Sequence, residues 1–378
     1  MRNALRCSLT GLMACIVVMP LLLGGCASSD APKPTALQAD PALFAVKEQW
    51  RLAVGATAAP LELRAVGSQL LVASKQGDIS SVDLRTGKLQ WRASLGVPLS
   101  AGVGSDGETS AVVTSENQLV ALREGKEIWR QKLPSVTLTS PLVAGARVFL
   151  TSADRTVSAF DAATGRKLWS QQRSGDALIL GQPGILMAVE DTLLTTQGGR
   201  LLGLNPQTGA IRWDAAVAVG RGVNEVERLV DLVSGTSRVG ANVCLRAFQA
   251  AVACVDAQTG RTLWTKTASG VSGIAGDAAS VFGVESDSKV QAWRRADGEK
   301  LWTNDKLRFR GLSSPVLAGR ALAVGDFEGF IHFLAPKDGA LLTRVTSDGS
   351  PIAQAPVWVN NTLVAVTQRG TLIGFRPE

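Results

Sequence analysis

Tyrosine is absent from this chain of 378 residues, and histidine occurs only once, at His332. Acid–base catalysis near neutral pH most often uses histidine, so it would depend here on His332 or on carboxylates, and no pair of carboxylates is marked out by its spacing. His332 stands between Ile331 and Phe333 in a strand-like run. That setting favours a packed or edge residue over a member of a Ser-His-Asp triad. We therefore predict no catalytic residue.

Clusters of metal-ligand residues and helical phosphate sites are also missing. No group of His, Cys, Asp and Glu has the spacing of metal ligands, so we predict no metal site and no cofactor. Residues 102–107 match the pattern G-x-G-x-x-G, but a strand-like run follows them. Without a helix N-terminus this pattern cannot hold a phosphate, so it predicts a turn.

Basic charge is modest and scattered along the chain. The formal net charge is +7, and Arg2 and Arg6 account for two of these charges, which leaves +5 on a chain that has lost its N-terminal segment. No run of Lys and Arg is interleaved with aromatic residues. This distribution argues against nucleic acid as a partner.

The N-terminal apolar run, residues 12–23, is too short to be an obvious membrane span. The sequence that ends at Cys26 has the form of a lipobox, which predicts lipid attachment at Cys26, and Ala27 after it favours the outer membrane. We expect a signal peptide (1–25), a lipidated flexible tether (26–43) and a folded domain (44–378). An ordinary signal peptide with an incidental cysteine is the alternative.

Only two of the five cysteines, Cys244 and Cys254, lie within the expected folded domain. They stand symmetrically about Gln249 in a predicted hairpin, and an exported protein permits oxidation, so we predict a disulfide between them. A buried free thiol at Cys254 is the alternative.

Tryptophan is the residue that organises the chain. It recurs with intervals of 41, 38, 40, 44, 51 and 38 residues. Six of the seven follow a glycine by four positions, most clearly in residues 161–169, where Asp-x-x-Thr-Gly predicts a tight turn. A small residue stands six positions before most of these glycines, and we expect it to make room for an indole from a neighbouring unit. The seven repeating tryptophans are Trp50, Trp91, Trp129, Trp169, Trp213, Trp264 and Trp302.

Short alternating runs between the turns predict about four strands in each forty-residue repeat, which is typical of a propeller blade. An eighth copy has Thr343 where the tryptophan should be. The last stretch, near Ile373, resembles a third strand, and the stretch around Trp50 resembles an isolated fourth strand. Together they predict an all-β, eight-bladed β-propeller of four-stranded antiparallel blades, closed by pairing of the N- and C-terminal strands. About ten extra residues fall within 218–234, a candidate binding loop or a tolerated insertion.

The Asp-x-x-Thr-Gly-x-x-x-Trp repeats resemble the quinoprotein-type repeat, which occurs in quinone-dependent dehydrogenases and in non-enzymatic propellers. With the lipobox, the length and a single eight-bladed unit, the chain resembles the BamB family, lipoproteins of the outer-membrane β-barrel assembly machine. The resemblance implies a non-enzymatic, lipid-anchored scaffold that faces the periplasm and binds the POTRA domains of BamA and unfolded outer-membrane proteins. A quinone-dependent dehydrogenase is the alternative, although it would carry adjacent cysteines, and so is a lipid-anchored propeller for another ligand.

The resemblance also points to partner-binding residues. The family's Leu-x-Leu-Arg loop corresponds best to Leu178, Leu180 and Gly181, so both leucines are kept and the arginine is lost. Its Asp-x-Asp loop corresponds to residues 231–233, so Asp231 is kept. We expect the leucines at the centre of an interface, with Asp231 and Arg228 on its polar rim. The alternative places both leucines in an ordinary inner strand.

Overall fold

The structure is a computed structural model that describes residues 32–57, 61–173, 179–220, 223 and 229–377. The chain divides into two units, Met1–Lys33 and Pro34–Glu378, and the second unit is the folded domain. Within the described residues all regular secondary structure is β-strand. Cys26, Leu178 and Arg228 lie outside the described residues.

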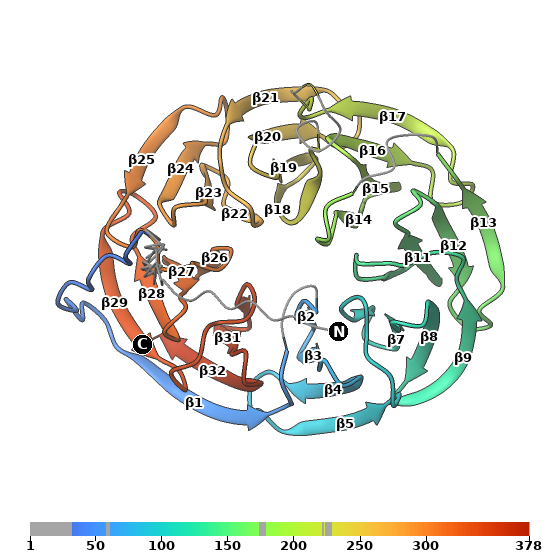
Figure 1. The fold of residues 1–378 in the computed structure, drawn as a ribbon, viewed down its shortest axis with the longest axis horizontal. Helices are drawn as coiled ribbons and strands as arrows, with labels where there is room; N and C mark the ends of the chain where they lie inside the picture. Colours follow the sequence, from blue (N-terminus) through green and yellow to red (C-terminus); the bar gives the residue numbers. More distant parts are fainter. Residues whose placement is uncertain (1–31, 58–60, 174–178, 221–222, 224–228, 378) are drawn as a thin grey trace, which may run out of the picture. The chain divides into compact units, whose positions relative to one another are not determined.

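Eight four-stranded antiparallel sheets form a ring, which confirms the predicted eight-bladed β-propeller (Figure 1). Blades 1 to 7 each use four consecutive strands. Blade 1 contains β2 (Arg64–Val66), β3 (Gln69–Ala73), β4 (Asp78–Asp83) and β5 (Leu89–Ser94); blade 2 contains β6 (Gly104–Ser105), β7 (Thr109–Val113), β8 (Gln118–Arg123) and β9 (Lys126–Lys132). Blade 3 contains β10 (Leu142–Ala144), β11 (Arg147–Thr151), β12 (Val157–Asp161) and β13 (Lys167–Gln171); blade 4 contains β14 (Leu186–Val189), β15 (Thr192–Gln197), β16 (Arg200–Leu204) and β17 (Ile211–Ala216).

The remaining blades continue around the ring in the same order. Blade 5 contains β18 (Leu232–Val239), β19 (Asn242–Ala247), β20 (Ala251–Asp256) and β21 (Thr262–Thr267); blade 6 contains β22 (Ile274–Gly276), β23 (Ser280–Val284), β24 (Val290–Arg294) and β25 (Lys300–Asn304). Blade 7 contains β26 (Val316–Ala318), β27 (Ala321–Gly325), β28 (Phe330–Leu334) and β29 (Leu341–Thr346); blade 8 contains β30 (Val357–Val359), β31 (Thr362–Val366), β32 (Thr371–Pro377) and β1 (Val46–Ala53). The inner strands of each blade bury aliphatic side chains on both faces of the sheet. Neighbouring blades therefore share apolar clusters.

The turn between the third and fourth strands is built as its sequence predicts. In blade 3 the Asp161 carboxylate accepts hydrogen bonds from the Thr164 backbone N–H (2.9 Å) and hydroxyl (2.8 Å). Gly165 then takes a φ of 72°, which glycine adopts without steric cost. These contacts reverse the chain and start the strand that carries Trp169.

The tryptophan does not pack as expected on the small residue that stands six positions before the turn glycine. Trp213 lies directly opposite Gly203 of its own blade, where an added Cβ would come within 2.2 Å of Trp213 Cε2. The same indole packs on Gly260, the turn glycine of the next blade, and its Nε1 donates to the Ala257 carbonyl (3.1 Å). The expectation was therefore wrong in one respect: the small residue makes room for the indole of its own blade, and the turn glycine receives the neighbour's indole.

Blade 8 joins the two ends of the folded domain. β1 pairs antiparallel with β32, and Trp50 stands opposite Gly374. Trp50 Nε1 also donates to the Leu84 carbonyl of blade 1 (3.0 Å). The predicted closure is confirmed, and it leaves neither β1 nor β32 as a separate unpaired strand.

The missing eighth tryptophan has a structural reason. In blade 8 the chain ends take the place of the turn between the third and fourth strands, so an indole at Thr343 would have no turn to pack on. Thr343 stands opposite Phe333, a large residue at the usually small position. Phe44 packs edge-on against Phe333, with the ring centroids 5.7 Å apart and an interplanar angle of 83°.

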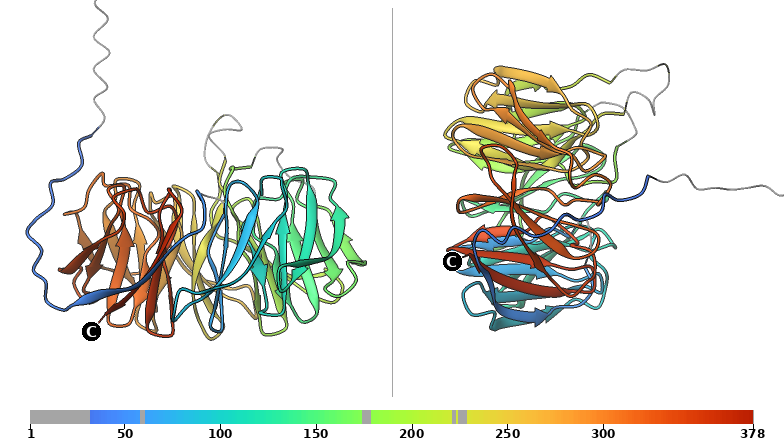
Figure 2. Two further views of the ribbon diagram at one scale, coloured as in Figure 1. Left: turned by 90° about the horizontal axis from the view of Figure 1, so that it is seen from below. Right: turned by 90° about the vertical axis from the view of Figure 1, so that its left-hand side faces the viewer.

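Residues 34–43, part of the expected tether, run along blade 7 and the loop before it (Figure 2). The Thr35 N–H donates to the Arg308 carbonyl (3.0 Å), and the Leu43 N–H donates to the Leu342 carbonyl (2.9 Å). Arg344 donates from its backbone N–H to the Asp40 carboxylate (3.3 Å). The chain is thus in contact with the propeller well before β1 begins.

Candidate functional site

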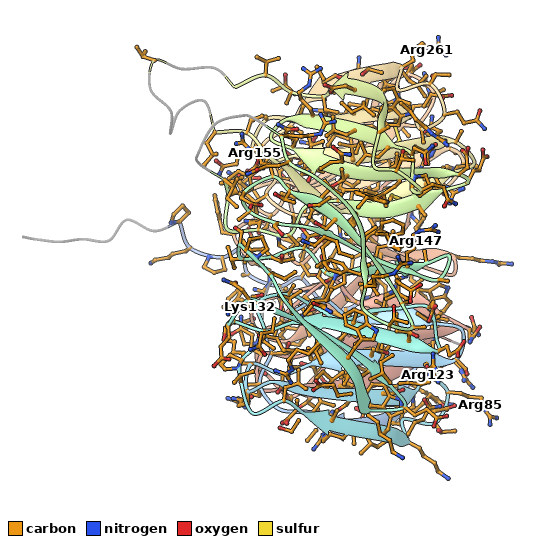
Figure 3. The ribbon with its side chains drawn as sticks, turned by 90° about the vertical axis from the view of Figure 1, so that its right-hand side faces the viewer. Arg85, Arg123, Lys132, Arg147, Arg155 and Arg261 are labelled. Carbon is orange, nitrogen blue, oxygen red and sulfur yellow. A yellow bond between two sulfur atoms is a disulfide. The ribbon has the colours of Figure 1, made fainter. Side chains whose placement is uncertain are left out.

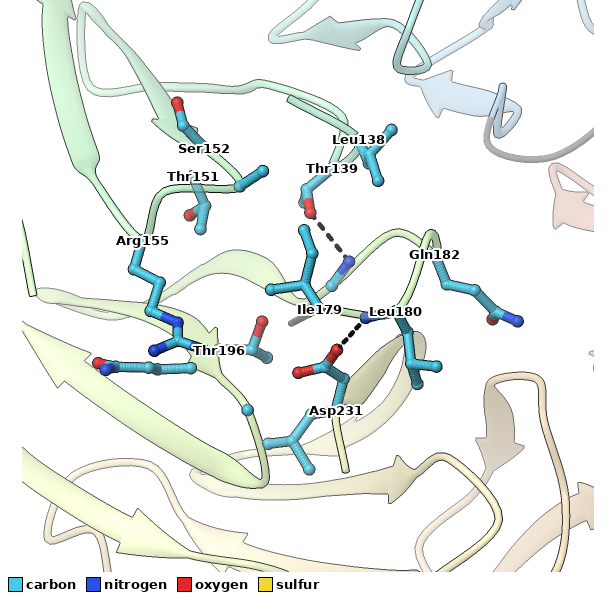
Figure 4. Close-up of a pocket in the computed structure, with 15 residues that line it drawn as sticks. Leu138, Thr139, Thr151, Ser152, Arg155, Ile179, Leu180, Gln182, Thr196 and Asp231 are labelled. Atoms are coloured by element: carbon cyan, nitrogen blue, oxygen red, sulfur yellow. Dashed lines mark hydrogen bonds between the residues drawn. The ribbon is translucent and has the colours of Figure 1, made fainter. Parts of the chain in front are cut away.

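Leu180 and Asp231, two of the predicted partner-binding residues, lie together at a pocket on one face of the ring (Figure 4). Leu180 belongs to the loop between β13 and β14, and Asp231 ends the insertion between β17 and β18. Blade 3 contributes the opposite wall, which includes Thr151 and Arg155. We call this site the Leu180 pocket; its other lining residues are Leu138, Thr139, Ser152, Ala153, Ile179, Gln182, Gly184, Thr196, Gln197, Gly198 and Leu232.

Hydrogen bonds hold the Leu180 loop at two points. The Asp231 carboxylate accepts the Leu180 backbone N–H at 2.6 Å, and the Thr139 hydroxyl accepts the Gly184 N–H at 2.9 Å (Figure 4). The inner strand of blade 4 begins only at Leu186. Leu180 therefore lies in a loop rather than in an inner strand, and its side chain is half-buried.

The Asp231 carboxyl is half-buried, and burial raises its pKa above the ordinary value. The hydrogen bond from the Leu180 N–H and the positive charge of Arg155 act in the opposite direction and favour the ionised form. We expected Asp231 on the rim of an interface. Asp231 also has a structural role, because its hydrogen bond connects the insertion to the Leu180 loop.

The sequence reasoning missed Arg155, which lies in the turn between β11 and β12 with a φ of 65°. Nothing in the local sequence marks this arginine, because its position in the pocket depends on the placement of blade 3 beside blade 4.

Cys244 and Cys254 face each other in β19 and β20 and are joined by a disulfide inside blade 5. Both are fully buried. Cys254 also stands opposite Trp264, so the small position described above is part of this bridge.

His332 is fully buried in β28, as a packed residue would be. Its Nε2 lies 2.9 Å from an Asp326 carboxylate oxygen, which also accepts a hydrogen bond from Arg310 Nε (2.8 Å). Burial lowers the pKa of His332, although the Asp326 carboxylate partly opposes this effect. The group resembles a structural ion-pair network more than a triad, since the histidine has no access to solvent.

Glu62 lies at the centre of the ring, a position that no sequence pattern predicted. Its carboxylate accepts a hydrogen bond from the Ser234 hydroxyl of blade 5, although Glu62 itself precedes blade 1. Glu62 and Ser234 both line the cavities along the axis, which explains why Glu62 is partly accessible although protein surrounds it. This enclosure raises the pKa of the Glu62 carboxyl.

The described residues contain no cluster of three or more His, Cys, Asp or Glu side chains that would hold a metal ion. The part of the chain that the structure describes also contains no helix long and apolar enough to span a membrane. Residues 102–107 form the β6–β7 hairpin and its approach, in agreement with the predicted turn.

Similar proteins share both the sequence and the fold. The chain is 38% identical over 375 residues to the outer membrane protein assembly factor BamB of Burkholderia pseudomallei, with 97% of each chain covered. It is 34% identical over 379 residues to BamB of Bordetella pertussis, with 97% of this chain and 95% of that one covered. The crystal structure of BamB from Moraxella catarrhalis matches with a TM-score of 0.79 at 25% identity, covering 88% of this chain and 100% of that one.

A more distant structure shares the fold alone. Quinohemoprotein alcohol dehydrogenase from Comamonas testosteroni matches with a TM-score of 0.68 at 13% identity, covering 87% of this chain and 76% of that one. The family model described as outer membrane protein assembly factor BamB matches residues 75–304, more than half of the chain. With the two relatives above 30% identity along nearly the whole length, this match shows that the chain belongs to the BamB family.

Proposed function

We propose that this chain is a non-enzymatic scaffold of the outer-membrane β-barrel assembly complex. In this role it binds the POTRA domains of BamA and aids the insertion of outer-membrane proteins, while a lipid on Cys26 anchors it to the periplasmic side of the outer membrane. The observation that carries the proposal is the Leu180 pocket, since it brings together Leu180 and Asp231, two of the partner-binding residues that the resemblance implies.

The surroundings of Leu180 suit a protein partner. Leu180 is a half-buried leucine in a loop, and it also lines a second hollow together with apolar residues that include Val217 and Phe248. Val219, in the insertion beside it, is 75% exposed. Apolar side chains rimmed by polar groups such as Asp231 are typical of protein interfaces, where a few desolvated anchors supply most of the binding energy.

The cysteine pair distinguishes this proposal from the enzymatic alternative. If this chain were a quinone-dependent dehydrogenase, we would expect an adjacent pair of cysteines near the cofactor. Here the pair is a cross-strand bridge between β19 and β20 inside a blade. This placement favours a structural role for the pair and therefore the scaffold over the dehydrogenase.

The test is the binding of purified variants to the POTRA domains of BamA from the same organism. We expect the double variant Leu178→Ala, Leu180→Ala to weaken binding by about fivefold or more, because truncation of an interface anchor costs upwards of about 1 kcal/mol. The single variant Leu180→Ala isolates the leucine whose position the structure describes, and it should account for part of that loss.

A double variant at Leu89 and Leu301 provides the matched control. These leucines are 44% and 41% exposed on β5 and β25, away from the pocket, so their change to alanine should leave binding unchanged. Melting temperatures show whether each variant remains folded. Undiminished binding by a folded Leu178→Ala, Leu180→Ala variant would remove the pocket from the interface, and no binding by the wild-type chain would refute the proposed partner.

A further inference from the structure

The resemblance to the BamB family implies an arginine directly after the second leucine of this loop, and the Leu180 pocket has none at that position. Gly181 stands at that position, it is exposed, and a Cβ added to it would meet no atom within 4 Å. The position is therefore open to solvent and carries no charge. A positive charge in this pocket can therefore come only from a residue other than Gly181.

Arg155 brings a positive charge to the same pocket from a different blade. It lines the pocket together with Leu180 and Asp231, and it is half-buried (Figure 4). Its electrostatic influence reaches Asp231, because its charge favours the ionised carboxylate. Arg155 and the Leu180 loop are thus parts of one site although they belong to different repeats.

The turn that carries Arg155 is held by its own hydrogen bonds. The Arg155 N–H donates to the Ser152 carbonyl (2.9 Å), and the Ala153 N–H donates to the Val136 carbonyl (2.8 Å). The Thr156 N–H donates to the Asp154 carboxylate (3.1 Å). Because the backbone of this turn is already ordered, loop ordering costs little when a partner binds Arg155, and the main entropic cost is that of the Arg155 side chain itself.

Arg155 lies on a different face of the ring from several other basic side chains. Figure 3 shows Arg155 and Lys132 toward one face of the ring, whereas Arg85, Arg123, Arg147 and Arg261 lie toward the opposite face. Lys132 donates to the Glu116 carbonyl and does not line the pocket. Arg155 is the basic residue among the described lining residues of the Leu180 pocket.

We propose that Arg155 takes the place of the missing family arginine and binds a carboxylate on the partner, beside the apolar contact of Leu180. A guanidinium has five N–H donors in a planar fork, so Arg155 can keep its contacts within the fold and still bind a carboxylate of the partner. The inference rests on the proposed function, since it names the chemical group of the partner that this pocket recognises.

The experiment compares three variants of the full chain in their binding to the purified POTRA domains of BamA. Arg155→Gln removes the charge and keeps most of the side-chain length. Arg369→Gln is the control, because Arg369 is exposed in the corresponding turn between β31 and β32 of blade 8. In the third variant, Arg155→Gln is combined with Gly181→Arg, which restores the arginine at the family's position.

We expect Arg155→Gln to weaken binding by about ten- to a hundredfold, the range for a lost hydrogen bond to a charged group. Arg369→Gln should bind like the wild-type chain, and Gly181→Arg should recover a substantial part of the loss. A merely structural role for Arg155 would lower the melting temperature and would not be rescued from position 181.

The outcomes separate this inference from the proposed function. If the wild-type chain binds the POTRA domains and folded Arg155→Gln binds equally well, Arg155 has no part in recognition and the inference is wrong. Equal losses in Arg155→Gln and Arg369→Gln would also refute it, because they would reflect net charge alone. If the wild-type chain does not bind, the proposed function fails and this inference fails with it.

Discussion

At the scale of single residues, the axis of the ring holds an ionisable group in an unusual environment. Glu62 reaches across the axis to the Ser234 hydroxyl, and its enclosure raises the pKa of its carboxyl above the ordinary 4.5. The folded state therefore binds the Glu62 proton more tightly than the unfolded state does. Its contribution to stability is fully present below about pH 4.5 and is lost as the pH rises through the raised pKa.

This linkage predicts a pH-dependent effect of Glu62→Gln. Glutamine stays neutral and keeps an oxygen that accepts the Ser234 hydrogen bond. The variant should match the wild-type chain in acid and become the more stable of the two as the pH rises above about 4.5, because only the wild-type residue ionises. Melting temperatures measured from about pH 4 to about pH 8 test this, with Glu116→Gln as an exposed control. A difference that stays constant across this range would contradict it.

At the scale of the secondary-structure elements, the next blade decides whether the third strand carries a small or a large residue opposite the tryptophan position. Gly203 lies under Trp213 because the indole must cross its own blade to reach Gly260. Where the next blade has no turn, Phe333 and Thr343 replace the small residue and the tryptophan. The repeat therefore departs from its pattern at the one blade interface where the chain ends lie.

The closing blade provides a test of this arrangement. Gly374 lies opposite Trp50, and a Cβ on Gly374 would come within 2.3 Å of Trp50 Cε2. We expect Gly374→Ala to reduce the free energy of unfolding by about 1–3 kcal/mol, the usual cost of an added methyl group in a packed core. Urea denaturation measures the change.

Gly181→Ala is the control for Gly374→Ala, because a Cβ at Gly181 meets no atom within 4 Å. A Gly374→Ala variant as stable as the wild-type chain would show that Trp50 moves aside without cost. The tryptophan would then contribute little to ring closure.

At the scale of the whole molecule, the propeller and the proposed lipid anchor lie in separate parts of the chain. The described residues form a ring of strands in which β1 and β32 are paired, and the proposed lipid site at Cys26 belongs to the segment that precedes Pro34. Acyl chains supply about 0.8 kcal/mol of membrane affinity for each buried CH₂ group, and stable anchoring takes more than one chain.

We therefore expect Cys26→Ala to abolish fatty-acid labelling of the chain and to release the protein from the membrane fraction. Metabolic labelling followed by fractionation measures both effects. The propeller should remain folded in this variant, with an unchanged melting temperature, because Cys26 precedes Pro34, where the folded unit begins. Unchanged labelling would contradict the lipobox interpretation.

The candidate site could be predicted only in part. The sequence located the insertion from the interval of 51 residues between Trp213 and Trp264, and the resemblance pointed to Leu180 and Asp231. It did not show that the Asp231 carboxylate accepts the Leu180 N–H, nor that Leu180 lies in a loop. These relations join segments that are 51 residues apart, and no local pattern carries them.

The sequence by itself determined the number of blades and the closure of the ring, because nearly every repeat contains its own turn and its own tryptophan and the two incomplete repeats at the chain ends add up to one blade. A regular spacing of local signals is sufficient when every unit packs only on its neighbours. The tertiary structure alone decided which indole covers which glycine, why Thr343 replaces a tryptophan, and that Arg155 and Glu62 lie near residues of other blades. Those contacts depend on how the blades are placed around the axis. Burial, charge and steric fit between different blades follow no periodic sequence pattern, so the sequence cannot predict them.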